Sequence, residues 1–357
     1  MHKFRNRFTI KMGMKMAITI KDIAREAGVS TATVSKVINN KMYVSPATKQ
    51  KVLQVMEALN YVPNVSAANL ARRDSKTILY ADSFYEGLPY HNPHMFDIIC
   101  GVSHELSRKG YRLSLLNMDS CEKKAGEVFE EAILSHVADG IIFSSVYANK
   151  QIERLMLQYD FPQICIGKPE FDTILSWIDT NHALSANLAV EYLLKSGCRK
   201  LAFIGGRKEE KIFMQRLNGF QTAMASNKLQ INEDWISYNN PDVNEVYESV
   251  TKMMNGTETP DGLICANSLI GVGALRALKE MKIDVPGEVS LIAFDDYPYS
   301  QTVATPPTVI DIDMFSLGVH AGNLVLKKVR DPAMLIQTYT ALPHLIERNT
   351  TRLYSPK

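Results

Sequence analysis

A short run near the N-terminus carries side chains that can hydrogen-bond to a nucleic acid. Residues 31–39 read as a helix in which Val34, Val37 and Ile38 form the buried stripe. The opposite face is small or polar and has no acidic side chain, which is what a helix needs to enter a major groove and contact base edges and phosphates. The side chains on that face are Thr31, Ala32, Thr33, Ser35, Lys36 and Asn39.

Two further predicted helices would hold this segment in place. Residues 20–27 place Ile20, Ile23, Ala24 and Ala27 at helical spacing, and Gly28 can take a positive φ and end that helix. Ser30 is a good N-cap for the helix that follows. Two short helices joined by a three-residue turn containing glycine make a helix-turn-helix.

The third helix is expected to begin with Ser45 as its cap and Pro46 at its first position, and to stop at Asn60. Its apolar face would be formed by Val52, Leu53, Met56 and Leu59. Three helices of this length can close a small core over the first two.

The distribution of charge favours the same interpretation. The whole chain has a net charge of +2, but residues 1–76 hold 14 Lys and Arg against 4 Asp and Glu, a net charge of +10. The remainder holds 26 basic and 34 acidic residues, a net charge of −8. A segment this basic is typical of a nucleic-acid binder. A basic solvated tail would explain the charge alone, but not the helical pattern.

From about residue 76 the pattern changes to apolar runs that alternate with helical ones, which indicates parallel sheets covered on both faces. We expect strands at 77–81, 111–116, 140–143, 162–166, 200–206, 262–266 and 289–294, and helices at 96–109, 122–134, 150–158, 181–196, 213–226 and 270–281. Ligands of such sheets bind beyond the carboxyl ends of the strands. Asp295 and Asp296 follow one such end, where carboxylates can accept hydrogen bonds from sugar hydroxyls, although either could instead cap a helix.

Other classes of protein have weaker support. The sequence shows no Gly-x-Ser-x-Gly motif, no P-loop and no paired nucleophile and base, so we expect no enzyme and no cofactor. His91 and His94 have no accompanying cluster with metal spacing. The chain lacks a long apolar stretch and a secretory leader, and its five cysteines are scattered, so we expect a cytoplasmic protein that binds no membrane.

The runs 20–39 and 44–64 resemble the headpiece of the lactose/galactose repressor family. The resemblance implies that Thr31 and Ala32 open the recognition helix, and that Lys36 stands where the family often has Arg. It also implies that residues 64–73 form a hinge helix on DNA, in which Asn64, Ala67 and Leu70 match the family pattern. Leu70 would be the apolar wedge pushed into a minor-groove step. A plain linker is the alternative for this segment.

The same family carries an effector domain with the type I periplasmic-binding-protein fold, two Rossmann-like subdomains joined by three crossovers. By this resemblance Arg216, Asn267 and Asp295 contact the ligand, and Phe96 stacks on a sugar ring. A surface salt bridge for Arg216 and a core position for Phe96 are the plainer alternatives.

The resemblance also implies the domain boundaries. Residues 1–16 would be a basic, disordered extension, 17–62 the helix-turn-helix headpiece, 63–75 the hinge, and 76–357 the effector-binding and dimerisation domain. Its N-subdomain would span about 76–178 and 310–342, and its C-subdomain about 179–309 and 343–357. Crossovers are expected near Trp177–Asp179, Pro307–Ile310 and Leu342–Pro343.

The resemblance implies a homodimeric transcriptional regulator, expected to be a repressor, of carbohydrate-utilisation genes. It would bind operator DNA and be switched by a mono- or oligosaccharide. The run from Ile166 to Asn181 also looks like the maltose-type regulators of Gram-positive bacteria, which hints at a gluco-oligosaccharide. By the same resemblance a ligand would lie in the cleft between the two subdomains. A transport-type binding protein would share the large domain but not residues 18–73, and an enzyme would need a catalytic group in that cleft.

Overall fold

The computed structural model of the chain describes residues 18–38, 44–59, 61, 75–85, 93–119, 123–240 and 242–353. The chain divides into two compact units between Ser75 and Lys76. The expected extension at residues 1–16 and the expected hinge, apart from Ser75, lie outside the described residues. Among the described residues, no helix is long and apolar enough to cross a membrane.

The described part of the first unit holds the three expected helices: α1 (Ile20–Ala27), α2 (Thr31–Ile38) and α3 (Pro46–Ala58). Their buried faces meet in one small core of Ile23, Ala24, Ala27, Val34, Val37 and Val52. The expectation for Leu53 was wrong. Its side chain is 46% exposed, because Val52 takes the inward position in that turn of α3.

Local capping sets where these helices begin and end. Gly28 has a φ of 63°, the left-handed conformation expected of it, and it ends α1. Ser30 Oγ accepts a hydrogen bond from the backbone N–H of Thr33 at 3.1 Å. Ser45 Oγ accepts one from the N–H of Thr48 at 3.2 Å. The predicted caps of α2 and α3 are therefore confirmed.

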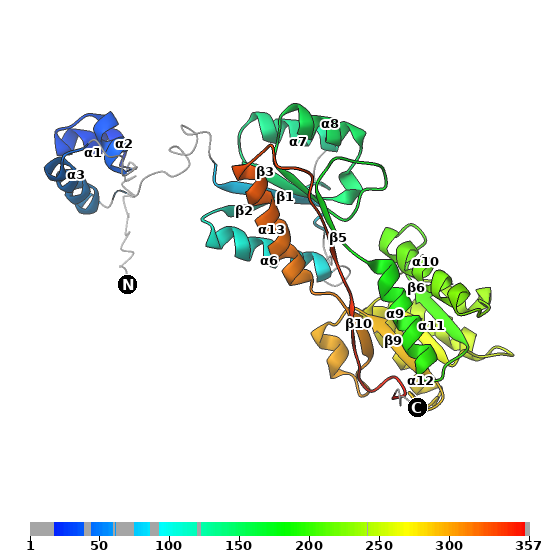
Figure 1. The fold of residues 1–357 in the computed structure, drawn as a ribbon. Helices are drawn as coiled ribbons and strands as arrows, with labels where there is room; N and C mark the ends of the chain where they lie inside the picture. The colour runs from blue at the N-terminus through cyan, green and yellow to red at the C-terminus, as the bar shows by residue number, and fades with distance from the viewer. Residues whose placement is uncertain are drawn as a thin grey trace, which may run out of the picture. The chain divides into compact units, whose positions relative to one another are not determined.

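The described residues of the second unit form two six-stranded sheets (Figure 1). Sheet A has the order β11-β5-β4-β3-β1-β2 and is parallel throughout. Its strands are β1 (Thr77–Asp82), β2 (Arg112–Asn117), β3 (Gly140–Ser144), β4 (Gln163–Ile166), β5 (Trp177–Thr180) and β11 (Thr338–Ala341). One face is covered by α6 (Pro93–Arg108) and α13 (Met314–Arg330), and the other by α7 (Ala125–Leu134) and α8 (Lys150–Gln158).

Sheet B has the order β12-β10-β9-β8-β6-β7, in which only the β10–β12 pair is antiparallel among the described strands. Its strands are β6 (Leu201–Gly205), β7 (Ile236–Tyr238), β8 (Gly262–Cys265), β9 (Ser290–Phe294), β10 (Thr308–Asp311) and β12 (His344–Ile346). Its helices are α9 (His182–Lys195), α10 (Lys211–Ser226), α11 (Val243–Met254) and α12 (Ser268–Glu280). Short 3₁₀ turns occur at Ser145–Tyr147, Glu233–Trp235 and Pro298–Thr302.

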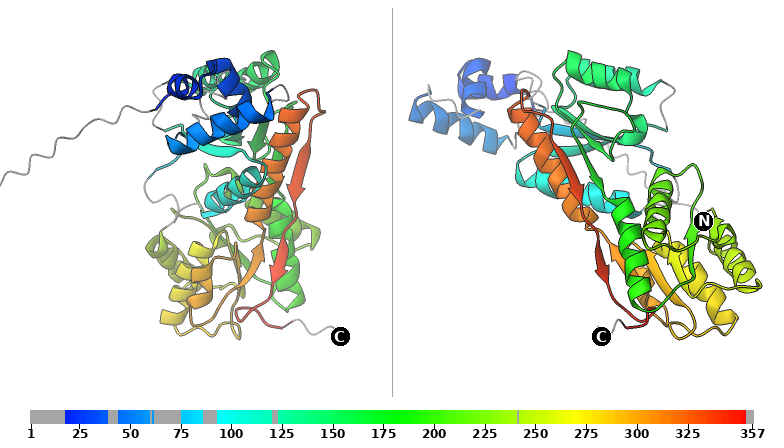
Figure 2. Two further views of the ribbon diagram at one scale, coloured as in Figure 1. Left: turned by 90° about the vertical axis from the view of Figure 1, so that its left-hand side faces the viewer. Right: turned by 45° about the vertical axis from the view of Figure 1, so that its right-hand side comes forward.

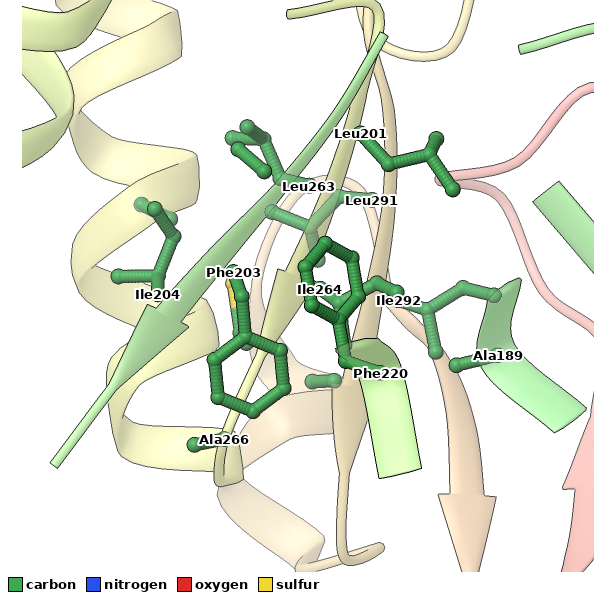
Figure 3. Close-up of a cluster of buried hydrophobic side chains, with 14 of the residues drawn as sticks. Ala189, Leu201, Phe203, Ile204, Phe220, Leu263, Ile264, Ala266, Leu291 and Ile292 are labelled. Carbon is green, nitrogen blue, oxygen red and sulfur yellow. The ribbon is translucent and has the colours of Figure 1, made fainter. Parts of the chain in front are cut away.

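The core of sheet B explains why its strands read as continuous apolar runs. Every residue of β6, β8 and β9 is buried, because helices cover both faces of a parallel sheet. Figure 3 shows Phe203, Ile264 and Ile292 of neighbouring strands packed with Phe220 of α10.

Within the described residues, the chain passes between the two sheets three times. It leaves sheet A after β5 for α9, returns after β10 to α13, and leaves again from β11 to β12 (Figures 1 and 2). The predicted fold class, a helical headpiece followed by two parallel-rich α/β subdomains, is confirmed.

The elements expected from the sequence did not include α11, α13 or the short strands β5, β7, β10, β11 and β12. Helix α13 holds Gly318, Gly322 and several valines, which are weak helix formers, and this composition hid the helix. Its apolar positions at Met314, Leu317, Ala321 and Val325 do follow helical spacing, and all four are buried.

Glycines allow α6 and α13 to pack backbone to backbone. A Cβ on Gly101 would lie 2.1 Å from the carbonyl oxygen of Phe315, and a Cβ on Gly318 would lie 2.2 Å from that of Ile98. Since real Cβ atoms do not approach backbone this closely, both positions need glycine. This contact joins the start of the second unit to its last helix.

Replacing Gly318 with alanine should lower the free energy of unfolding of the second unit by about 1–3 kcal/mol, because the added methyl overpacks the α6–α13 contact. The loss is expected even though alanine is intrinsically the better helix former. Urea titration followed by circular dichroism measures it. Asn323→Ala, at an exposed position of the same helix, is the control and should not lower stability, because it gains helix propensity without overpacking. Equal stability of Gly318→Ala and the parent chain would show that the helices can separate without cost.

Candidate nucleic-acid interface and effector site

Helix α2 presents the predicted polar side chains on its open face. Thr31, Ala32 and Lys36 are exposed, whereas Thr33 and Ser35 are half-buried. Val34 and Val37 point into the core and fix which face is turned outward. Thr33 is partly engaged within the headpiece, because its hydroxyl lies 2.9 Å from Ser30 Oγ. Thr31, Ala32 and Lys36 are thus the side chains most available to a partner.

Four predicted contacts cannot be located. Asn39, Asn64, Ala67 and Leu70 lie outside the described residues. Their roles remain predictions from the resemblance stated above.

A buried ion pair lies at the carboxyl edge of sheet B. Nη2 of Arg216, on α10, donates to Oδ1 of Asp295 at 2.8 Å, and Nη1 lies 3.3 Å from Oδ2. Arg216 and Asp295 are each only 3% exposed. The pair is therefore not the surface salt bridge considered as the alternative for Arg216. The guanidinium also stacks on the ring of Phe294 at 4.6 Å. The structure thus brings together two of the four predicted effector residues.

The backbone conformation of Asp295 turns its side chain toward Arg216. Asp295 follows β9 directly and has a φ of 72°, a left-handed conformation that Asp tolerates better than most residues. It does not cap a helix. Burial raises the pKa of Asp295, but the charges of Arg216 and His94 outweigh burial and hold that pKa well below its usual range. Asp295 is therefore a buried carboxylate rather than a neutral acid.

A histidine from the other subdomain reaches the same carboxylate. Nε2 of His94, at the start of α6, lies 2.9 Å from Oδ2 of Asp295. The ring of His94 also contacts the ring of Tyr297 at 5.3 Å between centroids. By the family resemblance His94 lies in the run 92–96 that matches the first ligand loop, but its contact with Asp295 was not predicted. The start of α6 three residues earlier than expected is what carries His94 to the cleft.

A second histidine lies close by. His182 begins α9 at the first crossover, is 6% exposed, and shares a hydrogen bond with Thr180 Oγ1 at 2.7 Å. Burial, and after it the charge of Arg216, lower the pKa of His182 to about 3. It is a neutral imidazole near neutral pH. Only its place directly after the predicted crossover could have drawn attention to it.

The other two predicted effector residues have local roles in this structure. Asn267 is the N-cap of α12, where its Oδ1 accepts a hydrogen bond from the N–H of Ile270 at 2.8 Å. Phe96 is 40% exposed on α6, so it is not a core residue. No ring contact or hydrogen bond recorded for the described residues joins either of them to the Arg216–Asp295 pair.

A cavity of about 380 Å³ lies beside the pair, within the usual size range of small-molecule sites. Both subdomains line it, with carboxylates and imidazoles prominent: His94, Asp97, Asp296, Tyr297, Asp311, Ile312, Asp313, Met314, Phe315 and His344. None of the four predicted effector residues lines it, but His94 lines the cavity and also reaches Asp295. Among the described residues, no three His, Cys, Asp or Glu side chains are grouped so as to hold a metal.

Two more polar contacts shape this region. Asp296 forms a bidentate pair with Arg348, with Nη1 2.8 Å from Oδ1 and Nη2 2.5 Å from Oδ2. Lys211, at the start of α10, donates across the cleft to the backbone carbonyl of Lys168 beyond β4. At the end of β1, burial raises the pKa of Asp82 to about 6. The arrangement can bind hydrogen-bonding ligands and link the two subdomains.

Comparison with known proteins identifies relatives over nearly the whole chain. Residues 19–64 match the family described as bacterial regulatory proteins, lacI family, and residues 190–351 match a periplasmic binding protein-like domain. An HTH-type transcriptional repressor PurR from Haemophilus influenzae (strain PittEE) is 30% identical over 338 residues, 94% of this chain and 98% of the relative. A PurR from Histophilus somni (strain 2336) is 29% identical over 334 residues, 94% and 99% of the two chains.

Solved structures share the fold. A lac repressor dimer bound to operator and the anti-inducer ONPF superposes with a TM-score of 0.80 at 24% identity, covering 94% of this chain and 99% of that one. A complex of the transcriptional regulator CelR with cellobiose gives 0.67 at 23% identity, covering 93% and 99%. A LacI family regulator from Enterococcus faecium with bound ribose gives 0.65 at 18% identity, covering 78% and 99%.

Replacing Arg216 with methionine should lower the free energy of unfolding of the second unit by about 3–5 kcal/mol, because it leaves Asp295 buried without its main counter-charge. Asp295→Asn, which suits the left-handed backbone, should also destabilise by leaving Arg216 unpaired. The double variant should lose less than the sum of the two, as a double-mutant cycle by thermal or urea unfolding would measure. The exposed pair Arg276–Glu280 is the control, and Arg276→Met should cost about 1 kcal/mol or less. Additive losses at Arg216 and Asp295 would contradict the coupling.

Proposed function

Since this chain belongs to the lacI family of bacterial regulatory proteins, and is therefore a DNA-binding transcriptional regulator, we propose that it is a homodimeric repressor whose operator affinity is switched by a sugar. The relatives reported above are transcriptional repressors, which confirms the prediction that the chain is not an enzyme.

The proposal for DNA rests on α2. Its exposed Thr31, Ala32 and Lys36 can reach base edges and phosphates, and none is acidic. Lys36 is a point charge, so it cannot present the two parallel donors of an arginine to a guanine. We therefore assign Lys36 mainly to phosphate contact and assign base selection to Thr31 and Ala32. Asn39 and the hinge residues Asn64, Ala67 and Leu70 complete the proposed contact set.

The proposal of a sugar is carried by the buried pair of Arg216 and Asp295. Because each charge neutralises the other, the pair offers donors and acceptors without a net charge. A neutral polyhydroxylated ligand can use both kinds of group, whereas a strongly charged ligand would break the pair. His94 and His182 add hydrogen-bonding imidazoles beside it. Asn267 and Phe96 are kept as effector contacts on the resemblance alone.

Known structural neighbours add support for a sugar. One is described as a complex with cellobiose and another as carrying ribose. At 23% and 18% identity they carry the fold, so the ligand class remains our proposal. In more detail, we propose that the ligand is a gluco-oligosaccharide and that the protein controls carbohydrate-utilisation genes.

The mechanism proposed is a two-state switch. His94 and Lys211 make contacts from one subdomain to the other, so a ligand that rearranges them changes the relative stability of the open and closed cleft. Operator affinity then shifts by the ligand's differential binding to those states and by no more.

Selection from a random duplex pool by the full chain tests DNA reading. One pseudo-palindromic sequence should be enriched, as a dimer of helix-turn-helix units requires. Lys36→Ala should weaken binding to every sequence alike and reduce the slope of log affinity against log salt by about 1, because it removes a phosphate contact. Lys279→Ala, exposed on α12, is the control and should bind like the parent. Failure to enrich any sequence at moderate salt would overturn the proposal.

A calorimetric screen of the purified chain against mono- and oligosaccharides, with nucleobases as a competing class, tests the effector. A sugar should bind, and Asp295→Asn should weaken it about 100-fold or more while operator binding persists. His94→Gln keeps the Arg216–Asp295 ion pair and should lower the affinity for the sugar about tenfold. This variant provides the test if Asp295→Asn fails to fold. Asp172→Asn, on the exposed surface, should have no effect. Binding of a nucleobase and no sugar would overturn the ligand class.

A further inference from the structure

A second, smaller cavity lies at the amino ends of the sheet A strands, on the side of the sheet away from the cleft. It has a volume of about 70 Å³, enough for several waters or one small molecule. It opens at the amino ends of the strands, where Gln163 begins β4, between the carboxyl ends of α8 and α13. The cleft residues follow the carboxyl ends of strands, so the two sites are separate.

Lys328 lines this cavity and is 9% exposed. Its ammonium has three N–H donors, but it donates at 3.3 Å to Ser176 Oγ, a neutral hydroxyl, and no carboxylate pairs with it among the described residues. Burial lowers the pKa of Lys328 accordingly. A buried ammonium with one neutral acceptor leaves strong hydrogen-bonding capacity unused.

Gln163 lines the same cavity and is 4% exposed. Its Oε1 is buried and receives no hydrogen bond within the part of the chain that the structure describes. A buried amide oxygen without a donor costs free energy, so a donor supplied by a ligand would be stabilising there.

Asp160, exposed at the rim, is the one carboxylate in the lining, and it forms no ion pair with Lys328 in the described structure. The cavity therefore offers a cation that needs acceptors, together with a carbonyl and a carboxylate that need donors. The rest of its wall is apolar, from residues such as Leu157, Phe161 and Leu175.

We propose that this cavity, between Lys328, Gln163 and Asp160, is a binding site for a small zwitterion, an α-amino acid of about the size of glycine. The ligand's carboxylate accepts hydrogen bonds from Lys328, and its ammonium donates to Gln163 Oε1 and Asp160. The partial negative charge of the helix carboxyl ends of α8 and α13 opposes a bare anion and tolerates a zwitterion with no net charge. The site goes beyond the proposed function and is independent of it.

Calorimetry on the full chain tests the site with glycine as the probe, and with acetate and methylamine as the two half-ligands. Glycine should bind, and each half-ligand should bind about tenfold or more weakly, since each lacks one charged hydrogen-bonding end. The readout needs neither operator nor sugar, so it stands or fails apart from the proposed function. Equal binding of glycine and acetate, or no binding of glycine, would overturn the proposal.

Three variants locate the site. Lys328→Met keeps the length of the side chain and should weaken glycine about 10- to 100-fold. Asp160→Asn, which tolerates the φ of 44° at that position, should weaken glycine but leave any acetate binding unchanged. Gln163→Met should weaken glycine as well. Lys327→Met removes the same charge from an exposed neighbour on α13 and is the control. Unchanged glycine affinity in Lys328→Met would place the ligand elsewhere and overturn the assignment.

Discussion

The buried pairing of Arg216 with Asp295 is the constraint on which the effector unit depends. Two charges taken out of water are tolerated only when each satisfies the other, and here α10 supplies one and the end of β9 the other. Because Asp295 must turn inward to meet Arg216, its backbone adopts a left-handed conformation. The pair therefore fixes how a helix and a strand of sheet B meet at the edge where ligands of such sheets bind.

His94 extends that constraint across the cleft. It belongs to α6, which packs backbone to backbone against α13 through Gly101 and Gly318. A movement of His94 relative to Asp295 therefore moves a rigid pair of helices rather than a single loop. Under the proposed two-state switch, this coupling would carry a change at the ligand contact to the whole sheet A subdomain.

Much of this could be predicted from the sequence because the signals are local. Gly28, Ser30 and Ser45 act within one turn of their own helices, and the strands of sheet B are apolar throughout. Arg216 and Asp295 were singled out by a family pattern, and the structure pairs them, while their contact with an effector stays a prediction. Contacts between distant segments were not: nothing near His94 in the sequence indicates Asp295, and nothing in the glycines of α13 indicates α6. Leu53 shows the converse, where a plausible apolar pattern was outweighed by the neighbouring core residue Val52.

The late return of the chain to sheet A affects how the protein is made. The headpiece core is complete once Tyr61 has been synthesised, whereas sheet A lacks α13 and β11 until Ala341 has been added. At typical rates of synthesis this interval lasts roughly 14 to 56 s. During it all residues of the headpiece core are present, while β3 and β4 of sheet A still lack the helix that covers them. The faces of β3 and β4 that α13 later covers therefore have to wait for a helix that is made after the whole of the sheet B strands β6 to β10.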